Sequence, residues 1–144
     1  MPAAARSRRI LIVDDQPEKL SLLQETVTHC FPERLVVETF LDPEPALLRC
    51  GDVDFDVVLS DFAMPGIDGA DVLRFVKGLQ PEAVRIMLGD TPDFAHMLDR
   101  IAAIGVFRYL AKPVSAERLC EVLLDAFTRH DEMRGACRRG LLAA

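Results

Sequence analysis

The chain has 144 residues, 50% of them hydrophobic, which is the usual size of one compact domain with a real core. Its formal net charge of −6 argues against general nucleic-acid affinity, because such binding needs basic surface to replace counterions. The chain lacks a run of about 18 apolar residues and an apolar secretion signal, so we expect a soluble, cytoplasmic domain without membrane affinity.

In chain order, short apolar runs alternate with amphipathic stretches. The runs that predict strands are 9–15, 35–40, 55–61, 84–88 and 106–111. The stretches that predict helices are 17–31, 43–50, one beginning after Asp68, 92–105 and one beginning after Ser115. Strict alternation of five strands and five helices predicts an α/β domain: a doubly wound, five-stranded parallel sheet with helices on both faces.

Two of these helices carry clear start signals. Asp68 is placed to cap the third helix, which we expect to bury Val72, Val76 and Leu79. Ser115 is placed to cap the last helix. The apolar residues that form one face of that helix are Leu119, Val122, Leu123, Ala126 and Phe127.

Acidic residues follow two of the predicted strands. Asp14 and Asp15 end the first, Asp61 ends the third, and Lys112 directly follows the fifth. Ligands of open parallel sheets bind beyond the carboxyl ends of the strands, so these side chains are expected to meet there. Three adjacent carboxylates raise each other's pKa values, and Mg²⁺, which prefers oxygen ligands, relieves the repulsion. Taken alone, Asp14 or Asp15 is more typical of a turn or cap, and Lys112 of an exposed loop.

Three motifs and their spacing, "LIVDD", "LSDFAMPGIDG" and "FRYLAKP", carry a resemblance to a known family. Over residues 9 to about 130 the chain resembles the receiver domain of two-component response regulators. The resemblance implies the flavodoxin-like strand order 2-1-3-4-5. It also implies a phosphoprotein that acts in phosphorelay signal transduction.

By this resemblance, Asp61 is the phosphoacceptor and receives its phosphoryl group from a histidine kinase. Asp15 and Asp61 would bind Mg²⁺ together with the backbone carbonyl of Ala63, and Asp14 would act through a metal-bound water. Lys112 would pair with the phosphoryl oxygens. These residue types suit phosphoryl transfer, which requires positioning and charge neutralisation.

The family pattern is broken at one position. Gly89 stands at the end of the fourth strand, where receivers normally have a Ser or Thr that binds the phosphoryl group. Tyr109 occupies the aromatic switch position that normally responds to that hydroxyl, and Thr91 could substitute if its loop bends inwards. Three interpretations remain: an active receiver with altered coupling, a receiver that uses Thr91, or a phosphorylation-impaired pseudo-receiver. The intact acids and lysine favour the first.

Two enzyme-like alternatives fit the sequence less well. A Mg²⁺-dependent aspartyl-phosphate phosphohydrolase has a second Asp two residues after its nucleophile, where this chain has Ala63. A dinucleotide-binding domain needs a Gly-rich loop after the first strand, and "DDQPEK" follows instead. We therefore expect a regulatory domain and not an enzyme. The resemblance implies a sensor histidine kinase or phosphotransfer protein as one partner. It also implies an effector that binds the fourth helix, fifth strand and fifth helix; a homodimer through the last helix stays open.

The remaining reactive side chains have plain structural explanations. Cys30, Cys50, Cys120 and Cys137 are scattered without a CxxC pair, so we expect free thiols in a reducing compartment. The histidines expected at the surface or at helix ends are His29, His96 and His130. The methionines expected to pack in the core are Met64, Met87 and Met97.

Both ends of the chain are expected to lie outside the folded domain. We assign 1–8 to a disordered tail, 9–130 to the receiver domain and 131–144 to a tail or the start of a linker. The arginines expected on solvated, frayed ends are Arg6, Arg8, Arg9, Arg134, Arg138 and Arg139. With no effector sequence within the 144 residues, we expect a stand-alone receiver or a piece of a longer regulator.

Overall fold

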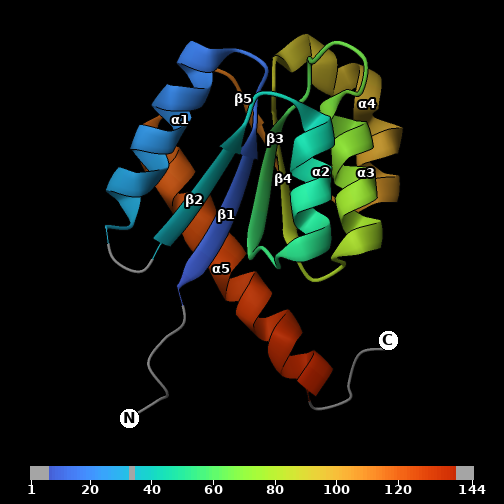
Figure 1. Cartoon of the computed structure of the whole chain (residues 1–144). Helices are drawn as coiled ribbons and strands as arrows, with labels where there is room; N and C mark the ends of the chain where they lie inside the picture. Colours follow the sequence, from blue (N-terminus) through green and yellow to red (C-terminus); the bar gives the residue numbers. More distant parts are fainter. Residues whose placement is uncertain (1–6, 33–34, 139–144) are drawn as a thin grey trace.

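The computed structural model describes residues 7–32 and 35–138, within which five strands alternate with five helices (Figure 1). The strands are β1 (Arg8–Val13), β2 (Leu35–Phe40), β3 (Val57–Asp61), β4 (Val84–Gly89) and β5 (Arg108–Ala111). The helices are α1 (Pro17–Cys30), α2 (Pro43–Asp52), α3 (Gly69–Leu79), α4 (Thr91–Ile104) and α5 (Ala116–Arg138).

All strand pairs are parallel, and the sheet order is β2-β1-β3-β4-β5. Figure 1 shows α1 and α5 on one face of the sheet and α2, α3 and α4 on the other. The predicted doubly wound α/β fold and its strand order are therefore confirmed.

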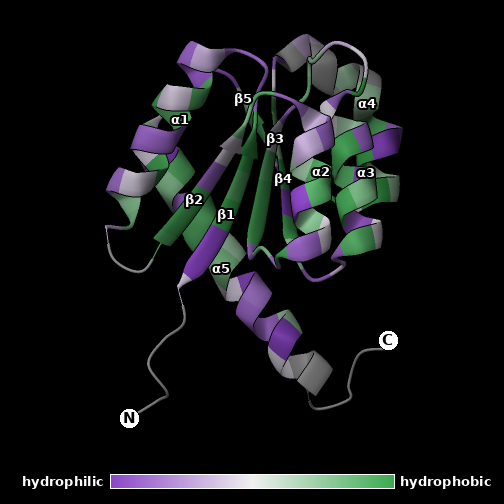
Figure 2. Ribbon diagram, in the orientation of Figure 1, coloured by the Kyte–Doolittle hydropathy of each residue, from purple (hydrophilic) through white to green (hydrophobic). Residues whose placement is uncertain are grey.

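The sheet separates two hydrophobic cores. Along β1, Ile10 and Ile12 pack towards α1 and α5, whereas Leu11 and Val13 pack towards α2, α3 and α4. This period of two is what a pleated strand imposes. Every residue of β3 is buried, and Figure 2 shows the central strands as the most hydrophobic part of the fold. The strand that ends in Asp61 is thus fixed firmly on both faces.

The predicted helix caps are present. The Asp68 carboxylate accepts a hydrogen bond from the Asp71 N–H at 2.9 Å, and Ser115 Oγ accepts one from the Arg118 N–H at 3.1 Å. Leu79, expected in the core, is 52% exposed, so that prediction is wrong. The neighbouring Gln80 side chain is buried instead and accepts from the Phe55 N–H at 2.8 Å. The buried side chain at this end of α3 is therefore a hydrogen-bonded amide and not Leu79.

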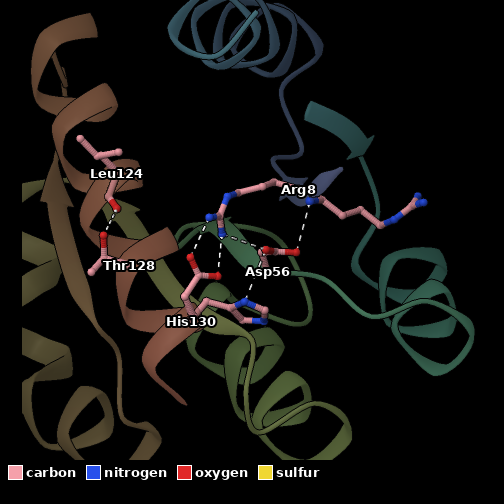
Figure 3. A network of polar contacts seen from close by, with 7 residues as sticks. Arg8, Asp56, Leu124, Thr128 and His130 are labelled. Carbon is pink, nitrogen blue, oxygen red and sulfur yellow. Dashed lines mark hydrogen bonds and ion pairs between the residues drawn. The ribbon is translucent and has the colours of Figure 1, made fainter. Parts of the chain in front are cut away.

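The last helix is longer than expected. It continues through 131–138, which we expected to be tail or linker, and Figure 1 shows it running past the edge of the sheet. His130, expected at the surface or at a helix end, lies within α5 and is buried with its Nδ1 3.4 Å from an Asp56 carboxylate oxygen (Figure 3). Arg8, expected in a frayed end, lies in β1 and pairs with Asp56 and Asp131. Both predictions failed because this edge is assembled from β1, β3 and α5, which are distant in sequence.

The cysteine prediction is wrong for one pair. Cys30 at the end of α1 and Cys120 in α5 form a disulfide, with their Cα atoms 5.5 Å apart. Cys50 is a free, buried thiol as expected, whereas the Cys137 side chain lies outside the described part of the structure. The three methionines expected to pack are buried, and His29 is exposed at the end of α1. The side chain of His96 is also outside the described part.

Candidate functional site

Three carboxylates meet at the carboxyl edge of the sheet. β1 and β3 are neighbours with Val13 opposite Ser60, so Asp14 and Asp61 leave adjacent strands at the same level. Asp15 follows directly, and one carboxylate oxygen from each of the three acids lies within 4.8 Å of the others. The predicted convergence of these acids is therefore present.

Two of these carboxylates have oxygens without a hydrogen-bond partner among the described residues. Asp14 is fully buried, and its Oδ1 accepts from the Gln16 N–H at 2.9 Å, whereas its Oδ2 accepts from no group there. Oδ1 of Asp15 is likewise buried and unpartnered in that part of the chain. Buried polar atoms are normally satisfied, so unsatisfied acceptors that face one another fit a bound cation.

Lys112 completes the site from the end of β5. Its backbone N–H donates to the Gly89 carbonyl at 2.9 Å, and its ammonium forms an ion pair with Asp61 Oδ1. Burial raises the pKa of Asp61, Lys112 opposes this shift, and the nearby Asp14 and Asp15 charges raise the pKa further. One lysine therefore offsets only part of the unfavourable environment of the Asp61 carboxylate.

The segment after β3 turns tightly beneath the site. The Gly69 N–H donates to the Phe62 carbonyl at 2.9 Å, and a Cβ at Gly69 would collide with the backbone carbonyl of Asp61. Gly66 has a φ of 80°, in the left-handed region that favours glycine. Ala63 lies in this turn and is exposed. The glycines of the motif thus keep the loop close to Asp61.

Gly89 and Tyr109 are in direct contact. A Cβ at Gly89 would collide with the Tyr109 hydroxyl oxygen and lie 3.1 Å from Cζ of that ring. The hydroxyl donates a hydrogen bond to the Asp90 carbonyl at 2.8 Å. The ring therefore covers the site of the missing side chain. Thr91 is the first residue of α4, and its side chain lies outside the described part of the structure.

A groove that the sequence did not predict lies beside the acids, with a volume of about 440 Å³. Its walls come from α1 and from the segment after β5, and its residues near the acids are Asp14, Asp90 and Lys112. The apolar wall residues are Leu22, Leu23, Leu88, Pro113, Val114 and Leu119. The feature that points to this groove is Leu22, a large apolar residue of α1 that is 63% exposed and lines it.

The sequence model of the protein family described as response regulator receiver domain matches residues 10–124 of this chain. The chain belongs to this family. The receiver domain is 34% identical to the two-component response regulator ARR12 of Arabidopsis thaliana over 131 residues, which are 89% of this chain and 21% of that protein. It is 36% identical to protein-glutamate methylesterase/protein-glutamine glutaminase 2 of Oleidesulfovibrio alaskensis over 121 residues, or 81% of this chain and 33% of that protein.

Solved structures agree with this assignment. A signal receiver domain of an HD domain-containing protein from Pseudomonas fluorescens is similar with a TM-score of 0.84 and 27% identity, over 94% of this chain and 97% of that one. The receiver domain spans only 21% and 33% of the two curated relatives, which carry further sequence of their own. Within the described part of the chain, every helix is too short or too polar to span a bilayer.

Proposed function

We propose that this receiver domain is a cytoplasmic phosphorylation switch, in which Asp61 accepts a phosphoryl group from the phosphohistidine of a sensor kinase or phosphotransfer protein. The observation that carries the proposal is the convergence of Asp14, Asp15 and Asp61 beside the Lys112 ammonium. A carboxylate paired with a single lysine can act as a nucleophile, and Asp61 is held in place by a strand buried on both faces.

The acidic cluster fits Mg²⁺. Asp15, Asp61 and the backbone carbonyl of Ala63 would hold the ion, with Asp14 acting through water. The unpartnered oxygens of Asp14 and Asp15 support this assignment, because Mg²⁺ prefers a few carboxylates plus waters. When bound, Mg²⁺ supplies positive charge that neutralises the phosphoryl oxygens.

The residues of the chain have separate tasks in the transfer. An Asp61 oxygen attacks phosphorus while the bond from phosphorus to the donor nitrogen breaks, and the donor histidine keeps the electron pair and takes up a proton. Lys112, paired with Asp61 beforehand, is placed to follow the negative charge onto the phosphoryl oxygens. Transfer of this kind requires alignment and electrostatic stabilisation more than covalent assistance.

The experiment incubates the protein with Mg²⁺ and acetyl phosphate and maps the phosphorylated residue by mass spectrometry. We expect one phosphoryl group on Asp61 and none after Asp61→Asn, which keeps the shape and removes the nucleophile. Asp54→Asn, an exposed carboxylate at the opposite edge of the sheet, is the matched control and should label like the wild type. Labelling that survives Asp61→Asn would place the acceptor elsewhere.

The output face would be formed by α4, β5 and α5. α4 and α5 expose Leu98 and Leu124, which are 51% and 58% accessible and give a protein partner or a second copy apolar surface to bind. Coupling to this face differs from the usual one, because the Tyr109 ring already covers Gly89. A phosphate can shift conformation only through differential contacts with two states.

The same contact favours a second candidate function, a pseudo-receiver that binds its partner regardless of phosphorylation. Beryllofluoride, which mimics an aspartyl phosphate, separates the two candidates. The switch predicts changes in amide chemical shifts across α4, β5 and α5 upon addition of the mimic. The pseudo-receiver predicts changes confined to the acidic site, or none.

A further inference from the structure

The Cys30–Cys120 disulfide joins α1 to α5 on one side of the sheet. We propose that this pair is a reversible oxidation site that locks the two helices together when a low-molecular-weight disulfide oxidant is present. The expectation that the disulfide is reversible rests on one part of the proposed function, the cytoplasmic location of the protein. Disulfides in that compartment are uncommon, and those that form are usually transient or redox-sensing.

The two cysteines of the pair differ from Cys50 in their exposure. Cys30 and Cys120 are half-buried, whereas the third described cysteine, Cys50, is buried in the opposite core. Burial raises the pKa of Cys50 to about 11, so it has almost no thiolate at neutral pH and is a built-in unreactive control. Among the cysteine side chains that the structure describes, there are therefore a partly exposed pair and an inert thiol.

The helices stay together without the covalent bond. Phe31, next to Cys30, packs edge-to-face on Phe127 of α5 with ring centroids 5.1 Å apart. Val27 of α1 belongs to the same buried cluster as Leu119 and Leu123. This apolar contact keeps the two thiols adjacent after reduction, so the pair can close again without refolding.

The chemistry balances with oxidised glutathione as the oxidant. One protein thiolate attacks a sulfur of oxidised glutathione, whose disulfide bond breaks and releases one glutathione. The second protein thiolate then attacks the mixed disulfide, the Cys30–Cys120 bond forms, and the second glutathione leaves. The two protein thiols lose two electrons and two protons, and both are recovered in the two glutathione thiols.

The lock lies beside the groove next to the phosphoacceptor. Thr26, one turn before Cys30, and Leu119, next to Cys120, both line that groove. α1 forms one wall of the groove and α5 reaches it through Leu119, so a bond between the two helices limits how far this end of the groove can widen. Oxidation should therefore slow amide hydrogen exchange in the second half of α1 and the first turns of α5, and leave α3 unchanged.

The test titrates the full chain with mixtures of reduced and oxidised glutathione, blocks free thiols with iodoacetamide, and identifies them by peptide mass spectrometry. We expect Cys30 and Cys120 to be alkylated together in the reduced mixture and protected together in the oxidised one, with a mass loss of two hydrogen atoms before alkylation. Cys50 should be alkylated only after unfolding. In Cys30→Ser, Cys120 should instead retain one glutathione.

Two results would overturn the proposal. One is a pair that stays reduced in every glutathione mixture. The other is a reduced protein whose sheet amide resonances collapse, because the disulfide would then be a structural requirement and not a switch. Asp61→Asn should show the same thiol titration as the wild type, so failure of phosphorylation and failure of the redox site are observed separately.

Discussion

At the scale of single residues, the contact between Gly89 and Tyr109 is the main departure from the usual receiver pattern. The tyrosine ring lies where a side chain at 89 would begin, and its hydroxyl is held by the Asp90 carbonyl. The space that a Ser or Thr side chain would occupy at position 89 is thus taken by the Tyr109 ring. Under the proposed function, we therefore expect little further inward movement of the ring on phosphorylation.

Gly89→Thr should restore a phosphate-dependent movement of Tyr109. The new side chain must displace the ring, so we expect a loss of about 2 kcal/mol in unfolding free energy from overpacking and the broken hydrogen bond. In return, the Tyr109 ring resonances should shift more on addition of beryllofluoride than in the wild type. Tyr109→Ala is the control background, in which Gly89→Thr should cost much less. Equal, full-sized ring responses with Gly89 and Thr at 89 would show that another group, such as Thr91, replaces the hydroxyl.

Lys112 is the second residue whose substitution should have a large effect on stability. Lys112→Met leaves Asp61 as a buried carboxylate without its cation, which should lower the unfolding free energy by about 3 kcal/mol at pH 7 in the absence of metal. It should also raise the pKa of Asp61 further, because the burial that already raises it is then unopposed.

The pH dependence of this loss has a definite sign. A raised folded-state pKa of Asp61 disfavours the folded state in full above that pKa, and this penalty fades as the pH falls from the folded-state pKa to the ordinary one. The deficit of Lys112→Met should therefore shrink as the pH falls through the raised pKa of Asp61. Urea unfolding of both proteins between neutral and acidic pH measures it, and Asp61→Asn should remove most of the difference between them. A deficit that stays constant with pH would mean that Lys112 acts through packing alone.

At the scale of elements, α5 is anchored at both ends. Ser115 caps its start beside Lys112, and near its far end His130 and Asp131 join Arg8 and Asp56 at the amino edge of the sheet (Figure 3). The Arg8 guanidinium also lies 4.7 Å from the centre of the Phe127 ring. The network ties β1 and the start of β3 to a helix that follows more than a hundred residues after Arg8.

Asp56→Ala should loosen this anchor. It leaves the buried His130 and part of Arg8 without their shared carboxylate, and we expect the unfolding free energy to fall by about 3 kcal/mol. Asp54→Ala removes an exposed carboxylate two residues away and should change it by less than about 0.5 kcal/mol. Equal effects in urea titrations of the two variants would show that the network adds no stability.

A second inter-element tie joins α3 to α4. Arg100 donates to both Asp68 carboxylate oxygens, at 3.0 and 3.1 Å. Burial opposes ionisation of Asp68, but the Arg100 bonds outweigh it and lower the pKa of Asp68. A lowered folded-state pKa contributes stability that is present above the ordinary pKa and lost as the pH falls through the folded one. Arg100→Met should thus cost about 1 kcal/mol near pH 7 and less in acid, measured by urea unfolding. A cost that grows in acid would contradict this assignment.

At the scale of the whole molecule, the local signals were sufficient for the architecture. Alternating apolar runs, caps at Asp68 and Ser115, and acids at strand ends depend on residues that are close in sequence. Strict alternation of strands and helices leaves few arrangements, and the motif resemblance selected the observed one. The convergence of Asp14, Asp15 and Asp61 followed from the order of the strands.

The features that the sequence did not reveal are long-range contacts. His130 is buried because Asp56 lies opposite it across the fold, and Cys30 meets Cys120 because α1 and α5 cover the same face, 90 residues apart in sequence. Periodicity describes which side of an element is apolar, but it cannot say which polar side chain will meet which partner. The inward ring of Tyr109 belongs to this class too, since only the fold brings it onto Gly89.

The length of α5 makes it a rod that connects the two ends of the domain. Its 23 residues span about 34 Å, from the cap at Ser115 beside Lys112 past the contact of His130 with Asp56. Between these two anchors the helix packs through Leu119, Val122 and Leu123, and its last turns run past the sheet edge (Figure 1). A shift of α5 along its axis at the Lys112 end would therefore reach the contacts of Arg8 and Asp56 at the opposite end of the domain.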